Sequence, residues 1–226
     1  MIELSRLTKT YVMGEETVAA LAGVDLSIGR GEYVAVVGPS GSGKSTMMNL
    51  LGGLDRPTDG DYVFEGEHVG GFDDDQLADF RNRRIGFVFQ SFQLLPRLSA
   101  LQNVELPMVY AGLEPAERRA KATALLERMG LGTRMGHKPT QMSGGQQQRV
   151  AIARALATDP DLLLADEPTG ALDQHTGQEV LALFEQLNRE GLTVLVVTHD
   201  LDVAARARRR ISFLDGRVVS DERSAS

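Results

Sequence analysis

The eight residues from Gly38 to Ser45 have the types and spacing of a phosphate-binding loop. They read Gly38-Pro39-Ser40-Gly41-Ser42-Gly43-Lys44-Ser45, which fits the pattern G-x-x-x-x-G-K-[ST]. The backbone N–H groups of such a loop cradle nucleotide phosphates. Lys44 would reach the β- and γ-phosphate oxygens, and Ser45 would ligate Mg²⁺. A strand-like run precedes the loop and a helical pattern follows it, so the context agrees with the motif.

Two carboxylates, Asp166 and Glu167, follow the apolar run Leu162–Ala165 and could complete that chemistry. An aspartate here can hold Mg²⁺ through water, and the next carboxylate can polarise a water for attack on phosphate. A solvated strand end is the alternative, and the pair alone would favour it. Pro168 then blocks continuation of the strand.

Gln90 and His199 also follow apolar runs, and each could touch the same phosphates. Gln90 could ligate Mg²⁺ or sense the γ-phosphate, and His199 could hydrogen-bond the γ-phosphate. A lone histidine after a strand is more often structural than catalytic, so each residue is a weak signal by itself. Tyr11 could stack on adenine, or it could belong to the core.

A second anion site is indicated by the run M-S-G-G-Q-Q-Q-R at residues 142–149. Ser143 can cap a helix, and Gln146 lies three residues on, as a capping box requires. Gly144 and Gly145 have no side chains that would keep an anion from the backbone N–H groups. The run therefore predicts a helix N-terminus that can bind an anion.

The elements that must position these residues are strands buried on both faces. Four apolar runs have this character, and they lead into Gly38, Gln90, Asp166 and Thr198-His199. These runs are Val34–Val37, Phe87–Phe89, Leu162–Ala165 and Val194–Val197. Ligands of open α/β sheets bind at the carboxyl edge of the strands. Four such strand ends indicate one shared site.

Other segments give weaker expectations. Residues 57–60 read as a turn, and residues 114–130 as a helix with a Glu117–Lys121 ion pair on its surface. The arginine-rich run 206–210 could touch anionic lipid headgroups, although a solvated helix face is the better expectation. Residues 221–226 are polar and predicted to fray.

Composition limits the classes of function. The chain has 226 residues, enough for one sizeable core, and a formal net charge of −7, which disfavours nucleic acid as a partner. Cysteine is absent, which excludes disulfides and thiolate metal sites. We expect no signal peptide, because a basic start followed by an apolar run is not seen. We also expect no membrane span, because no apolar stretch approaches 18 residues. Any membrane role must therefore come through a partner.

Taken in order, these motifs resemble the ATPase subunit of ATP-binding cassette (ABC) transporters over nearly the whole chain. The resemblance implies that Tyr11 is the adenine-stacking residue, Gly38–Ser45 with Thr46 the Walker A loop, Gln90 the Q-loop, Ser143–Gln146 the signature, Leu162–Asp166 Walker B, Glu167 the catalytic carboxylate, Ala171–Asp173 the D-loop and His199 the switch histidine. One departure is Met142, where the family usually has leucine, and this swap preserves an unbranched apolar contact.

The resemblance also implies a fold and an assembly. The expected fold is an α/β P-loop NTPase: a RecA-like core with an N-terminal antiparallel β-subdomain over 1–90 and 158–220, an inserted helical subdomain over 91–157, and the tail 221–226. ATP and Mg²⁺ are the implied ligands. Two chains are expected to pack head to tail as a homodimer, each signature helix binding the γ-phosphate held by the other chain's Walker A loop.

A closer likeness is to the macrolide-export and lipoprotein-release branch, the MacB- and LolD-like ATPases. It is carried by the stretches Leu51–Thr58, Phe92–Leu98 with Asn103–Pro107, Gln146–Arg149 and Ala165–Asp173. It implies a separate transmembrane permease and a peripheral location on the cytoplasmic face of the inner membrane. The permease contact would lie near Phe92–Val109, although that apolar stretch could simply be core.

Two alternatives remain at this point. The cell-division ATPase FtsE is a near relative of this branch, so a mechanotransmission role in division would use the same chemistry. A soluble ABC ATPase of DNA repair or translation is disfavoured, because those proteins carry long or zinc-binding insertions or two cassettes.

Overall fold

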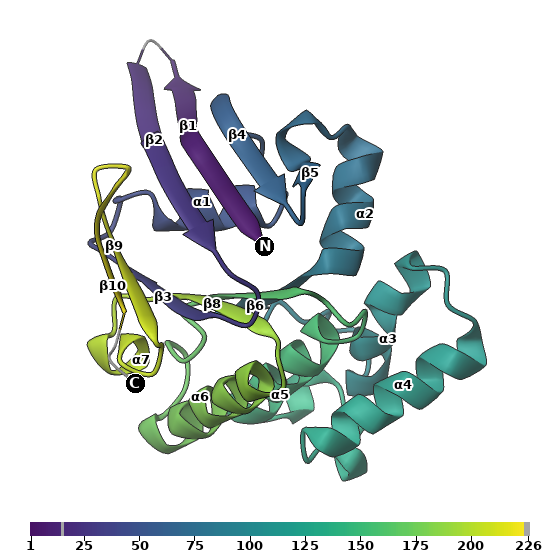
Figure 1. The fold of residues 1–226 in the computed structure, drawn as a ribbon. Helices are drawn as coiled ribbons and strands as arrows, with labels where there is room; N and C mark the ends of the chain where they lie inside the picture. Colours follow the sequence, from purple (N-terminus) through teal and green to yellow (C-terminus); the bar gives the residue numbers. More distant parts are fainter. Residues whose placement is uncertain (15, 224–226) are drawn as a thin grey trace.

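The computed structural model describes residues 1–14 and 16–223, and in this part of the chain the strands form two sheets (Figure 1). The smaller sheet is antiparallel, with the order β2-β1-β4-β5. Its strands are β1 (Ile2–Met13), β2 (Glu16–Ile28), β4 (Asp59–Phe64) and β5 (Glu67–His68). The larger sheet has the order β10-β9-β3-β8-β7-β6. Its strands are β3 (Tyr33–Val37), β6 (Ile85–Phe89), β7 (Leu162–Asp166), β8 (Thr193–Val197), β9 (Arg209–Leu214) and β10 (Arg217–Arg223).

The four predicted apolar strands are parallel neighbours in the larger sheet and are covered on both faces. Strand β3 pairs with β8, β8 with β7, and β7 with β6. Alternate residues face alternate sides of the sheet. Val34 and Leu164 accordingly belong to one hydrophobic cluster, whereas Ala35 and Leu163 belong to the other. The expected carboxyl edge therefore exists as one continuous edge.

Helices cover the larger sheet on both sides. They are α1 (Lys44–Leu51), α2 (Asp74–Arg84), α3 (Ala100–Tyr110), α4 (Pro115–Arg128), α5 (Gly144–Ala155), α6 (Gln174–Arg189) and α7 (Leu201–Ala204), with 3₁₀ turns at Val69–Gly71, Gly132–Arg134 and Pro139–Gln141. Helices α1 and α2 share one cluster with the small sheet. Helices α3 to α7 share the other, and Figure 1 shows α3 to α6 on the side of the large sheet away from the small sheet.

Local signals fix several helix boundaries. Helix α5 begins with the predicted capping box: the Ser143 hydroxyl accepts from the Gln146 N–H, and the Gln146 side chain accepts from the Ser143 N–H. Helix α4 starts at Pro115, and Gly130 follows its end with φ 72°. Helix α4 thus falls within the predicted helix over 114–130.

Two local predictions are wrong. The turn over 57–60 is shorter than expected, because Asp59 already belongs to β4. The ion pair of Lys121 is made with Asp159, not Glu117. In both cases a partner distant in sequence overrides the local pattern.

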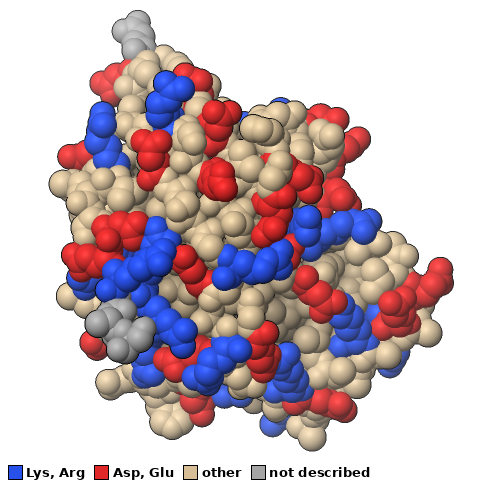
Figure 2. All heavy atoms as spheres, viewed as in Figure 1, with Lys and Arg blue, Asp and Glu red and all other residues tan. Residues whose placement is uncertain are grey.

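The prediction that the arginine-rich run 206–210 is a solvated helix face is wrong, because Arg209 and Arg210 lie in strand β9. Arg206 pairs with Glu185, Arg209 with Glu32, and Arg210 with Glu222. Figure 2 shows basic and acidic side chains mixed across the face it displays. These three arginines are therefore paired with carboxylates of the same chain, which reduces the charge that the run offers to lipid headgroups.

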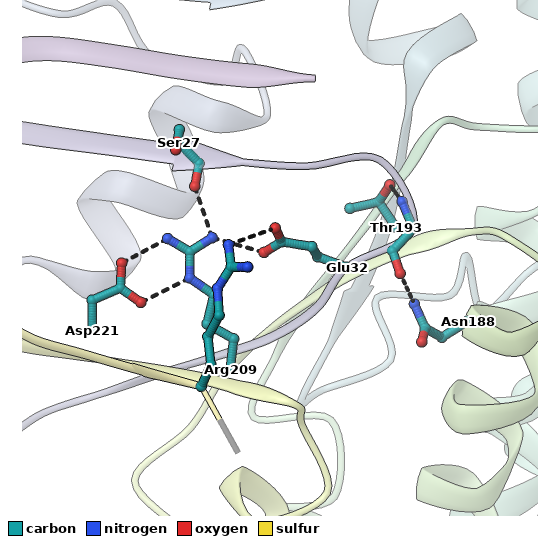
Figure 3. Close-up of polar contacts among 8 residues, drawn as sticks. Ser27, Glu32, Asn188, Thr193, Arg209 and Asp221 are labelled. Atoms are coloured by element: carbon teal, nitrogen blue, oxygen red, sulfur yellow. Dashed lines mark hydrogen bonds and ion pairs between the residues drawn. The ribbon is translucent and has the colours of Figure 1, made fainter. Parts of the chain in front are cut away.

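The predicted fraying from Asp221 onward is wrong for residues 221–223, which belong to β10; residues 224–226 lie outside the described part. Arg209 donates from Nε and Nη2 to the two carboxylate oxygens of Asp221, at 2.7 and 2.6 Å. It also donates to Glu32 Oε2 and to the Ser27 carbonyl (Figure 3). The polar end of the chain is thus tied to the loop before β3.

Candidate active site

A cavity of about 720 Å³ lies at the carboxyl edge of the large sheet. Ten of the predicted site residues line it: Ser40, Gly41, Gly43, Lys44, Ser45, Thr46, Gln90, Asp166, Glu167 and His199. They come from the loop after β3, from the start of α1, and from the ends of β6, β7 and β8. The topology therefore brings together residues as far apart in sequence as Ser40 and His199.

The loop after β3 is shaped by glycines in the left-handed region. Gly43 has φ 102° and lies so close to the small sheet that a Cβ there would be 2.5 Å from the Ala20 carbonyl oxygen. A Cβ on Gly38 would lie 2.3 Å from the Phe213 carbonyl oxygen. These close approaches exclude larger residues and press the loop between the two sheets. Helix α1 begins directly afterwards at Lys44.

Lys44 is a buried cation held against its own loop. Its ammonium donates to the carbonyl oxygens of Gly38 and Pro39, each at 2.8 Å. The loop also has the unmatched N–H groups of the first turn of α1, which has no acidic residue there. Ammonium and helix N-terminus together make this end of the cavity strongly favourable for phosphate.

Asp166 and Glu167 form a carboxylate pair facing Lys44. Burial, together with the neighbouring Glu167 charge, raises the pKa of Asp166, and Lys44 opposes the shift. A half-buried carboxylate whose charge is incompletely compensated favours a bound cation. The pair is therefore an acceptor for a metal or for a proton.

The carboxylate of Glu167 is oriented from the end of β8. Oε2 accepts from the Thr198 hydroxyl at 2.9 Å, and Oε1 accepts from the His199 backbone N–H at 2.9 Å. Nδ1 of His199 lies 2.6 Å from Oε1. Glu167 itself has φ 43°, a left-handed conformation that a non-glycine residue keeps only where its surroundings enforce it.

The donor set fits Mg²⁺. Ser45 offers a hydroxyl, Gln90 an amide oxygen and Asp166 a carboxylate, and all three line the cavity. Hard oxygen donors suit Mg²⁺, which typically takes few protein ligands and completes its shell with water and substrate phosphates. In the described residues there is no group of three or more His, Cys, Asp or Glu placed to hold a metal.

The predicted anion site at Ser143–Gln146 is a real helix start, but it is not part of this cavity. None of these four residues is among the described residues that line the cavity. Packing also requires glycine at position 145, which the sequence did not reveal. A Cβ there would lie 2.3 Å from Cγ2 of Thr176. The N-terminus of α5 thus rests on the start of α6.

Tyr11, Gly38, Pro39 and Ser42 are also absent from the lining. Gly38 and Pro39 contribute carbonyls that hold Lys44, and the Ser42 hydroxyl is buried within the loop. The Tyr11 hydroxyl donates to Asp55 at 2.8 Å. Burial and Asp55 raise the pKa of Tyr11. Adenine stacking by Tyr11 stays a prediction.

Several contributing residues were not assigned a role from the sequence. Val18, Ala19 and Ala20 of β2 line the cavity, and Val18 lies opposite Tyr11 across the β1–β2 pair. No local motif marks them, because they reach the loop only through packing of the two sheets. Thr198 was visible beside His199, and its position at a strand end was the available signal.

A second hollow of about 750 Å³ lies between α2, β6 and α3. Its lining is mostly apolar and includes Leu54, Ile85, Phe87, Phe89, Leu106, Pro107 and Tyr110. Tyr110 is 77% exposed, and Leu54 is 49% exposed. The hollow overlaps the stretch 92–109, and its lining includes Phe89, which directly precedes Gln90 in the chain.

Comparison with protein families decides what this arrangement is. The model of the family described as "ABC transporter" matches residues 21–170, which is more than half of the chain. The chain belongs to the ABC transporter family. As a member it is an ATP-binding and ATP-hydrolysing cassette of the P-loop fold.

Relatives of this ABC cassette are of two lengths. It is 55% identical over 221 residues to the macrolide export ATP-binding/permease protein MacB of Hyphomonas neptunium, covering 98% of this chain but 34% of that protein. It is 55% identical to an uncharacterized ABC transporter ATP-binding protein of Thermotoga maritima, covering 99% of this chain and 95% of that protein. The chain thus spans about a third of the length of the permease-fused relatives it matches.

A solved structure agrees with the fold. The ATP-binding cassette MJ0796, described as a dimer in a post-hydrolysis state bound to ADP and Pi, superposes with a TM-score of 0.92 at 48% identity, with full coverage of both chains. The likeness confirms the predicted α/β fold. In the described part of the ABC cassette, no helix is both long and apolar enough to cross a membrane.

Proposed function

We propose that two copies of this ABC cassette close head to tail around two ATP molecules, and that this closure drives a separate membrane permease of the MacB or LolD type. The single observation that carries the proposal is the separation of the two phosphate-binding helix starts. Lys44 at the start of α1 lines the catalytic cavity, whereas Ser143–Gln146 at the start of α5 do not. An anion site outside the cavity can bind the phosphate of a nucleotide that is held by a second chain.

In this proposal the chain's residues divide the work. The loop N–H groups and Lys44 bind the β- and γ-phosphates, and Glu167, oriented by Thr198 and His199, accepts a proton from the attacking water. Mg²⁺, held by Ser45, Gln90 and Asp166, would neutralise charge that develops on the phosphate oxygens. Tyr11 would stack on the adenine.

A complementation experiment tests the shared site. Lys44→Ala removes phosphate binding at the chain's own loop, and Gly144→Glu places a carboxylate at the signature. Each variant alone is expected to be nearly inactive. Mixed in equal amounts, half of the dimers contain one intact composite site, so the mixture should regain a substantial fraction of wild-type ATPase activity. Activity no greater than the sum of the separate variants contradicts the proposal.

The permease is proposed to bind at the second hollow. The observation in favour is an exposed apolar lining around Tyr110 that includes Phe89, the residue before Gln90, which is one of the predicted ligands of Mg²⁺. The arrangement would connect the partner's position to the catalytic cavity. The contact falls at the end of the stretch near Phe92–Val109 and extends beyond it to Leu54 and Tyr110.

Membrane recruitment tests this surface. Tyr110→Glu should leave basal ATPase activity unchanged and should reduce the fraction of the protein that sediments with membranes from its own cells. Val219→Glu is the matched control, because Val219 is an exposed apolar residue on β10, 59% accessible and outside the hollow. Equal sedimentation of the wild type and both variants contradicts the assignment.

A further inference from the structure

Gln148, on the signature helix α5, is joined to the residue that follows Glu167. Its Nε2 donates to the Pro168 carbonyl oxygen at 2.5 Å, and its side chain is fully buried. Oε1 of the same amide is buried without a hydrogen-bond partner among the described residues. A buried amide oxygen without a hydrogen-bond partner destabilises a fold. Packing alone therefore does not explain why a glutamine stands at this position.

The peptide that Gln148 holds belongs to a constrained turn. Glu167, with φ 43°, donates its N–H to Val197 at 2.9 Å and accepts at its carbonyl from Gly170 at 3.0 Å. These two bonds come from β8 and from the turn itself. The bond from Gln148 to Pro168 adds a restraint from α5 on the next peptide, so the backbone that aims the carboxylate is fixed from both sides.

The first turn of α5 packs on the residues that follow Pro168 in the chain, as far as Thr176. A Cβ on Gly144 would lie 3.4 Å from Leu172, and Gly145 lies against Thr176. Close-packed groups shift together rather than deform. A small displacement of the N-terminus of α5 is therefore passed to Pro168 and to the backbone of Glu167.

From these contacts we propose that Gln148 is a positioning residue that couples the signature helix to the catalytic carboxylate of its own chain. The inference rests on the proposed head-to-tail dimer. There the start of α5 touches the nucleotide bound to the partner, while Glu167 of the same chain acts on the nucleotide at its own loop. Gln148 thus links the two nucleotide sites of the dimer through one chain.

The test replaces the amide by an apolar side chain of similar length. Gln148→Met should lower kcat about 10-fold or more, because small misplacements of a catalytic group are costly. The Hill coefficient for ATP should fall toward its non-cooperative value. KM and nucleotide affinity of the monomer should stay unchanged. Gln147→Met is the matched control, because Gln147 is the adjacent residue of α5 and donates to Met142 at 3.1 Å instead of to Pro168. It should retain wild-type cooperativity.

A purely structural role makes a different prediction. Gln148→Leu is the second variant, and all assays are run well below the lowest melting temperature of the set. A wild-type kcat and Hill coefficient in either folded Gln148 variant overturns the inference. A loss confined to thermal stability or to KM overturns it as well.

A separate variant tests whether the dimer forms at all. Glu167→Gln in saturating ATP reports dimer formation without involving Gln148. If Glu167→Gln forms no dimer, the proposed function fails. If it forms the dimer and Gln148→Met hydrolyses ATP cooperatively at the wild-type rate, the proposed function stands and only the coupling role is overturned.

Discussion

The hydroxyl of Thr198 donates to Oε2 of Glu167 at 2.9 Å, and the Thr198 side chain is 1% exposed. Oε1 of the same carboxylate accepts from the next residue along the chain, His199. Both oxygens of the proposed general base are thus held by consecutive residues at the end of β8. Orientation of Glu167 is therefore built into the sheet rather than left to a surface loop.

Thr198 offers a pair of variants that tests its hydroxyl, which donates to Glu167 and also accepts from the Asp200 N–H at 3.0 Å. Thr198→Val keeps the shape but removes the donor, and kcat should fall about 10-fold or more because Glu167 loses one of its two anchors. Thr198→Ser keeps the hydroxyl and should remain close to the wild-type rate. Steady-state ATPase assays with a check of nucleotide affinity give the answer. Equal kcat for the two variants would show that the bond does not position Glu167.

Asp166→Asn is expected to abolish hydrolysis and yet stabilise the fold. The raised pKa of Asp166 means that its ionised form is disfavoured in the folded state. For an acid with a raised folded pKa, ionisation at neutral pH reduces stability, and acidification through that pKa restores it. Asparagine removes the charge, so melting at pH 7 should occur a few degrees higher. The gain over wild type should shrink as pH falls.

Exposed Asp215 supplies the control for that experiment. Asp215→Asn should leave both the melting temperature and the ATPase rate near the wild-type values. A melting temperature of Asp166→Asn that is lower than wild type at pH 7 would show that Lys44 compensates the Asp166 charge fully.

Gly145→Ala separates packing from anion binding at the signature. The new Cβ would overlap Cγ2 of Thr176, whose hydroxyl is held by Asp173 at 2.6 Å. Overpacking of this kind costs about 1–3 kcal/mol. Thr176→Ser removes the methyl but keeps the hydroxyl, so the double variant should recover most of the stability in denaturant titrations. If the double variant is no more stable than Gly145→Ala, the contact is not the cause.

Arg209→Met should destabilise the protein by about 2–3 kcal/mol, because it leaves Asp221 without this buried partner and leaves Glu32 with only the exposed Arg223. Arg210→Met is the control: Arg210 is 47% exposed and pairs with Glu222, so the expected cost is below about 1 kcal/mol. Arg209 lowers the pKa of Asp221, so its contribution is present at neutral pH and lost on acidification through that lowered pKa. Equal unfolding free energies for the two variants at pH 7 would contradict the anchoring role.

Local patterns predicted many of the residues that the structure gathers at the cavity, because these residues lie at or next to strand ends. The loop of Lys44, the carboxylates after β7 and the capping box of Ser143 are each set by a few neighbouring residues. Parallel pairing then brings the Lys44 loop and the carboxylates, but not the Ser143 capping box, to one edge of the sheet.

Long-range pairing explains what the sequence did not reveal. Arg209 has the local character of an exposed arginine-rich run, and only the β9–β10 pair and the approach of Glu32 make it a buried anchor. The bond between Gln148 and Pro168 likewise spans two elements whose relative position no local pattern specifies. Such contacts are fixed by tertiary packing, which single-residue periodicity does not encode.

The most direct measurement of the central claim is the mass of Glu167→Gln in solution, by sedimentation or by light scattering after gel filtration. With Mg²⁺ and saturating ATP the variant should have twice the mass of one chain, and with ADP it should have the mass of one chain. Adding Gly144→Glu should return the ATP-bound form to single-chain mass. A Glu167→Gln protein that binds ATP and stays at single-chain mass at all concentrations would contradict the account.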